Sequence, residues 1–87
     1  MQQIHQNHKS ELDKCLVAYQ NANPKASMGL HRLYANCKNL WVEMDKEFVE
    51  CRRKGRLTLK YTELEAKFAD CIHNFEQWQL MAKLLYA

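Results

Sequence analysis

The 87-residue sequence is poor in the residues that make tight turns, since it holds only two glycines and one proline. A β-sandwich needs a turn every few residues, so this scarcity fits long helices better than a sandwich. No apolar run is long enough to cross a bilayer. The polar segment 1–14 also lacks the apolar core that a secretory signal requires.

The chain also lacks a strong excess of charge of one sign. Its net charge is +3, from 13 basic and 10 acidic residues spread along the sequence, which is too little to indicate binding of nucleic acid. A domain of this length buries a small core, so it needs disulfides, a metal or a partner for stability. The four cysteines could supply that stability by forming two disulfides.

The spacing of apolar residues predicts three amphipathic helices, at about residues 4–20, 25–54 and 59–85. In the second helix the apolar residues recur in alternating steps of three and four, and the third helix repeats this pattern. The apolar positions of the first helix are Ile4, Leu12, Cys15, Leu16 and Tyr19. Short connections favour antiparallel neighbours, so we expect one all-α domain over residues 1–87, a helical hairpin that a third helix extends into a three-helix bundle.

Capping residues mark the ends of these helices. Asn23 can cap the second helix with Pro24 at its first position, and Gly55 suits the residue after its end. Ser10 and Thr62 are each followed three residues later by an acidic residue, so we expect capping boxes there. The first helix would begin at about Ile4 or Ser10, and the third at Thr62 or a turn earlier.

All four cysteines fall on the apolar stripes of the predicted helices. Cys15 and Cys37 lie on either side of the first break, and Cys51 and Cys71 lie on either side of the second. Because residues equidistant from a turn meet in an antiparallel pair, we expect two interhelical disulfides, Cys15–Cys37 and Cys51–Cys71. Each would close a loop of about twenty residues and stabilise the fold by about 3 kcal/mol. Buried free thiols would occupy the same positions, so that alternative stays open.

Neither a metal site nor an enzyme is indicated. No two cysteines have the close spacing of a zinc knuckle. His5 and His8 lie in a polar terminal segment, where exposure to solvent is the simpler interpretation. A bundle of this size has no cleft for a cysteine, a histidine and a third orienting group. We therefore expect no catalytic residue, no metal and no cofactor.

Two segments carry a family resemblance: Leu12-Asp13-Lys14-Cys15-Leu16, and the stretch from Cys37-Lys38-Asn39-Leu40 to Glu47-Phe48-Val49-Glu50-Cys51-Arg52-Arg53. Residues 5–54 thereby resemble the coiled-coil-helix–coiled-coil-helix proteins of the mitochondrial intermembrane space, the twin C-x9-C family, and in particular the branch linked to cytochrome c oxidase biogenesis. The sequence departs from the family at His5, which stands where the family has a cysteine, and in the C-x13-C spacing of Cys37 and Cys51. Cys71 on the added third helix would then replace the usual partner of Cys51.

This resemblance implies a non-catalytic protein that enters the intermembrane space without a cleaved presequence and is oxidised there. It would be an accessory subunit or assembly factor of a respiratory or other inner-membrane complex. Its partners would be protein subunits of that complex, with peripheral contact to inner-membrane lipid and none to nucleic acid. Two alternatives come from other classes of protein: a cytosolic or viral helical adaptor with buried free thiols, and a thiol- or metal-handling factor.

The C-terminal segment 75–86 is apolar on more than one side, since Leu80 and Met81 widen its stripe. Trp, Tyr and Met are typical of protein interfaces, so we expect a docking surface here, although the first two helices could also cover both sides. The expected docking residues are Phe75, Trp78, Met81, Leu84, Leu85 and Tyr86.

Overall fold

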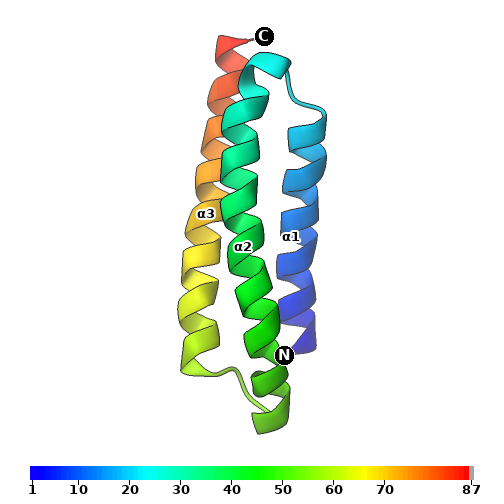
Figure 1. The fold of residues 1–87 in the computed structure, drawn as a ribbon, viewed down its shortest axis with the longest axis vertical. Helices are drawn as coiled ribbons and strands as arrows, with labels where there is room; N and C mark the ends of the chain where they lie inside the picture. The colour runs from blue at the N-terminus through cyan, green and yellow to red at the C-terminus, as the bar shows by residue number, and fades with distance from the viewer. Residues whose placement is uncertain (87) are drawn as a thin grey trace.

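The computed structural model describes residues 1–86 and consists of three long helices, α1 (Gln2–Gln20), α2 (Pro24–Lys54) and α3 (Leu59–Leu85). Each helix runs antiparallel to the one before it, so α1 and α3 lie against α2 in a rod of 48 × 18 × 15 Å (Figure 1). The prediction of an all-α, three-helix fold is confirmed for the part of the chain described. α1 begins two residues earlier than predicted and α2 one residue earlier.

The predicted ends of α2 are confirmed by its caps. The Asn23 side chain accepts a hydrogen bond from the backbone N–H of Lys25 at 2.9 Å, and Pro24 is the first helical residue. Gly55 ends the helix in the left-handed region, with φ of 72°, which glycine adopts without a steric penalty. The same glycine turns the chain back towards α3.

The two predicted capping boxes are wrong. Ser10 lies inside α1, because the polar segment before it is already helical. Thr58, four residues before Thr62, caps α3 by accepting a hydrogen bond from the backbone N–H of Tyr61 at 3.2 Å. The Thr62 hydroxyl instead donates to the Thr58 carbonyl at 3.1 Å, as a residue in the first turn can.

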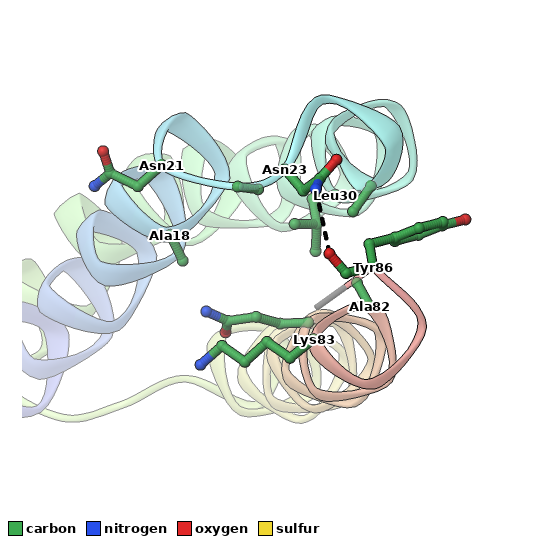
Figure 2. A pocket seen from close by; sticks show the side chains of 10 residues that line it. Ala18, Asn21, Asn23, Leu30, Ala82, Lys83 and Tyr86 are labelled. Carbon is green, nitrogen blue, oxygen red and sulfur yellow. Dashed lines mark hydrogen bonds between the residues drawn. The ribbon is translucent and has the colours of Figure 1, made fainter.

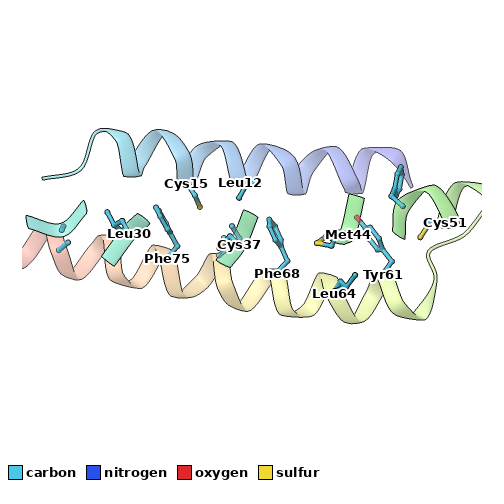
Figure 3. Close-up of a cluster of buried hydrophobic side chains, with 14 residues drawn as sticks. Leu12, Cys15, Leu30, Cys37, Met44, Cys51, Tyr61, Leu64, Phe68 and Phe75 are labelled. Atoms are coloured by element: carbon cyan, nitrogen blue, oxygen red, sulfur yellow. The ribbon is translucent and has the colours of Figure 1, made fainter. Parts of the chain in front are cut away.

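The core runs along the whole axis between the three helices (Figure 3). α3 places the fully buried rings of Tyr61, Phe68 and Phe75 at steps of seven residues, and the next step is Ala82. A seven-residue repeat keeps one face of a helix turned towards its neighbours. α1 and α2 close this layer with these buried residues: Leu12, Cys15, Ala26, Leu30, Cys37, Met44, Phe48 and Cys51.

The predicted disulfides are not formed, because all four cysteines are free and no pair is at disulfide distance. The axes of packed helices lie about 8–10 Å apart, so a disulfide can bridge two helices only where the two cysteines stand directly opposite each other, with Cα atoms within about 7 Å. Cys15 and Cys37 both face the core but remain free. Both are buried and belong to the apolar core, which is the alternative that the sequence left open.

The pairing of Cys51 with Cys71 fails because the two residues lie at different heights. The Cys51 sulfur is 3.6 Å from the Thr58 hydroxyl oxygen, immediately across the Gly55 turn. Cys71 lies thirteen residues further along α3 than Thr58, which is about 20 Å of helix. The thiol that approaches Cys71 belongs to Cys37.

Candidate docking site at the loop end

Two of the four cysteines, Cys15 and Cys37, are buried thiols of low reactivity. Burial, followed by the neighbouring thiols of Cys71 and Cys15, raises the pKa of the Cys37 thiol from 9.0 to about 12. Burial, followed by the charges of Glu76 and Glu11, raises the pKa of Cys15 to about 11. Since the thiolate is the nucleophile and the metal ligand, both thiols are inert at neutral pH.

His5 is buried in the core, contrary to the expectation that it is exposed to solvent. Its Nδ1 lies 2.8 Å from the Tyr61 hydroxyl on α3, and its Nε2 lies 2.9 Å from Asp45 on α2. Its ring stacks on Phe48 at 4.2 Å between centroids and on Trp41 at 5.2 Å. One side chain of α1 is thus bonded to both other helices.

His8 makes a second contact of the same kind, with Nε2 2.7 Å from a carboxylate oxygen of Glu65 on α3. No three His, Cys, Asp or Glu side chains within residues 1–86 are placed to hold a metal ion. We call residues 1–9 and 41–65 the histidine end of the bundle. Tyr61 is fully buried there, so no substrate reaches its hydroxyl, and the arrangement is structural.

The burial of His5 could have been predicted from its position in the sequence, although a search for apolar residues alone does not include it. His5, Leu12 and Tyr19 are spaced by seven residues, so they share one face of α1. Ile4, which was expected on the apolar stripe, is 41% exposed instead.

The six expected docking residues separate into two groups. Phe75 belongs to the core, and Trp78 packs its indole against Gly29 of α2. Tyr86 is half-buried. Met81, Leu84 and Leu85 are 53%, 78% and 63% exposed, and the neighbouring Leu80 is 57% exposed.

These exposed residues form one continuous surface on the last two turns of α3, which we call the outer band: Leu80, Met81, Leu84 and Leu85. Positions 80, 84 and 81, 85 are four residues apart, so they stack along one side of the helix. Earlier on the same helix the exposed residues His73, Asn74 and Gln77 are polar. The outer face of α3 therefore changes from polar to apolar at its end.

A cavity of about 460 Å³ opens between the ends of the three helices beside the outer band (Figure 2). Its apolar wall is formed mainly by Ala18, Ala22, Ala26, Leu30 and Ala82. Its polar edge is formed by Asn21, Asn23, Gln79, Lys83 and Tyr86. The Asn23 side chain donates a hydrogen bond to the Tyr86 carbonyl at 3.3 Å, which ties the loop to the end of α3.

The net positive charge of the molecule lies at this same end, although few of its charged residues do. We call residues 16–34 and 77–86 the loop end; they include Lys25, Arg32 and Lys83 and no acidic residue. The other ten of the 13 basic residues balance the 10 acidic residues, so the net charge of +3 lies entirely at the loop end. The loop end is therefore both apolar and basic.

No helix within residues 1–86 is long and apolar enough to cross a membrane. No family model, curated protein or solved structure matches the chain. The resemblance to the twin C-x9-C family therefore remains a prediction.

Proposed function

We propose that this protein is a non-catalytic helical docking module that binds a partner protein through the outer band. The observation that carries the proposal is the exposure of four large apolar side chains on one side of the last two turns of α3. Soluble domains rarely expose such side chains together unless a partner covers them. The rigid bundle behind the band would present it in one fixed orientation.

The free thiols favour the adaptor form of this function, in which the chain works in a reducing compartment. The resemblance offers a more specific alternative, an oxidised accessory subunit or assembly factor of a mitochondrial inner-membrane complex. Peptide mass mapping of natively purified protein, with free thiols blocked and no reductant, separates the two. Four blocked thiols support the adaptor, whereas interhelical bridges support the mitochondrial subunit.

Site-specific photocrosslinking tests the docking function. A benzoylphenylalanine replaces Leu84 in the outer band, and a matched variant carries it at His73, which is exposed earlier on the same helix. In cells that express the full chain, we expect one discrete adduct with a different protein from position 84 and none from position 73. Equal labelling from both positions, or an adduct of two copies of this chain, would contradict the proposal.

A double substitution in the band separates docking from folding. Leu80→Gln with Leu84→Gln removes two exposed apolar side chains, so we expect the free energy of unfolding to change by no more than about 0.5 kcal/mol. Urea unfolding measures this change. The adduct from a benzoylphenylalanine at Leu85 should disappear in the same variant, and an adduct that persists would show that the band is not the contact surface.

A further inference from the structure

The cavity at the loop end has no role in docking through the outer band, because it lies between the helices. Along α3 the positions that face the core at steps of seven hold Tyr61, Phe68 and Phe75, but the fourth position holds Ala82. An aromatic side chain is thus missing where the series would continue. Alanines on α1, on the loop and on α2 leave the same space unfilled. The cavity is therefore a product of several small residues at one level of the bundle.

The wall of this cavity is aliphatic, and its volume of about 460 Å³ lies within the range of small-molecule sites. Water that fills such a space finds few hydrogen-bond partners along alanine and leucine side chains. An alkyl chain would displace that water and bury apolar surface on both sides. The shape and lining consequently suit an aliphatic ligand better than a polar one.

The edge of the cavity adds a charge requirement. Lys83 lines the cavity, and Figure 2 shows its side chain extending along the opening below Ala18. None of the ion pairs among residues 1–86 involves Lys83. The loop end holds no acidic residue that could neutralise this ammonium group. A ligand with a negatively charged end would pair with Lys83 while its chain fills the cavity.

We propose that the cavity binds a single-chain amphiphile with an anionic headgroup, with the alkyl chain against Ala18, Ala26 and Ala82 and the headgroup beside Lys83. The site does not depend on the docking function, because neither the cavity wall nor Lys83 belongs to the outer band. A carboxylate or a phosphate satisfies the same chemistry. Such a ligand can come from solution or from a bilayer.

The first experiment titrates the full ¹⁵N-labelled chain with decanoate and, separately, with neutral decanol, both below the concentrations at which they self-associate. We expect decanoate to cause saturable shifts of amide signals around the cavity, at residues 18–26 and 79–86, and to bind at least tenfold more tightly than decanol. No saturable shift there, or shifts confined to residues 80, 81, 84 and 85, would overturn the proposal.

Two substitutions with matched controls locate the contacts. Lys83→Gln should reduce the preference for decanoate over decanol to within twofold, whereas Lys67→Gln, an exposed lysine earlier on α3, should leave it unchanged. Ala18→Leu should fill the cavity and weaken decanoate binding at least tenfold, whereas Ala69→Leu at an exposed position should not. The spectrum of each free variant shows that the bundle is intact. Unchanged binding by Lys83→Gln and Ala18→Leu would contradict the assignment.

Vesicles distinguish the two sources of the ligand. Flotation with vesicles that contain phosphatidylglycerol, compared with neutral phosphatidylcholine vesicles, measures attachment to a bilayer. Attachment that Ala18→Leu abolishes would support uptake of a lipid chain from a membrane, and decanoate binding without attachment would support a free amphiphile. Attachment to anionic vesicles without any decanoate binding would overturn the cavity site, because the basic surface alone would then account for it.

Discussion

At the histidine end, polar side chains of all three helices bond to one another across the core, with His5 contacting Asp45 and Tyr61. At the loop end, the Asn23 side chain donates a hydrogen bond to the carbonyl of Tyr86, and this bond links the loop after α1 to the end of α3. The histidine end is filled by stacked rings, whereas the loop end is lined by alanines around a cavity. The same three helices therefore form one closely packed end held by interhelical hydrogen bonds and one end with an open cavity.

This difference assigns stability and binding to opposite ends of the bundle. Buried hydrogen-bonded groups hold α1 against the other two helices, and leaving one such group unpaired carries a large penalty. Small side chains and exposed leucines contribute less to the free energy of folding but leave surface available for other molecules. Substitutions and pH titration can test this division, and the part of the core that the two ends share should show the largest effect.

The largest expected effect concerns the thiols in the middle of the bundle. The pKa of Cys15 and of Cys37 is raised from 9.0 to about 11 and about 12, so the folded state keeps protons that the unfolded chain releases. The stabilisation is complete below pH 9 and is lost as the pH rises through the folded values. Between pH 9 and pH 11 we expect the free energy of unfolding to fall by about 4 kcal/mol from these two groups.

Urea unfolding under reducing conditions measures this dependence. The variant with both Cys15→Ala and Cys37→Ala should lose most of it, whereas Cys71→Ala, at a partly exposed position, should retain most of it, because burial is the largest cause of both shifts. If the double variant and the natural chain lose stability equally between pH 9 and pH 11, the middle of the bundle is not the dry core that both ends share.

Substitution of His5 comes next in size. His5→Ala removes two hydrogen bonds and two ring stacks and leaves the buried Tyr61 hydroxyl without its partner, so we expect a loss of about 3 kcal/mol. At the loop end, Asn23→Ala removes a helix cap and one interhelical hydrogen bond and should cost about 1 kcal/mol. Urea unfolding at pH 7 compares the two variants. Equal losses would contradict the assignment of stability to the histidine end.

The exposed His73 supplies the control for this comparison. It lies on the outer face of α3, so His73→Ala should change the free energy of unfolding by less than about 0.5 kcal/mol. A larger loss would indicate that the alanine substitution itself perturbs helices of this bundle, whichever contacts are removed.

The smallest effect concerns the two glycines, one near each end. A Cβ atom at Gly29 would lie 2.6 Å from the Trp78 indole nitrogen, so Gly29→Ala should displace the ring and cost about 1 kcal/mol net, after the gain in helix propensity. Gly55→Ala should cost a similar amount because the left-handed backbone strains any side chain there. Trp78 fluorescence, read in a Trp41→Phe background, should shift for Gly29→Ala alone. A shift in both variants would contradict the local explanation.

Much of this fold could be read from local pattern. Asn23, Pro24 and Gly55 acted as expected because a cap or a left-handed residue is determined by its immediate neighbours. The disulfide prediction failed because pairing depends on the register of two helices and on the distance between them. Packing also decided which of the expected docking residues are exposed. Phe75 and Leu84 are both apolar, so the sequence does not distinguish them, but Phe75 faces the core and Leu84 faces solvent.

By itself, the sequence determined the number of helices, their boundaries to within about two residues, and the seven-residue repeat that places Tyr61, Phe68 and Phe75 in the core. The net charge of +3 and the apolar side chains at positions 80, 81, 84 and 85 come to lie at one end only when the chain folds back twice. The tertiary structure alone decided that His5 joins all three helices, that the cysteines remain apart, and that alanines distant in sequence surround one cavity. The physical reason is that periodicity specifies which face of a helix is buried, whereas the height and distance at which two faces meet depend on packing along the whole length of both helices.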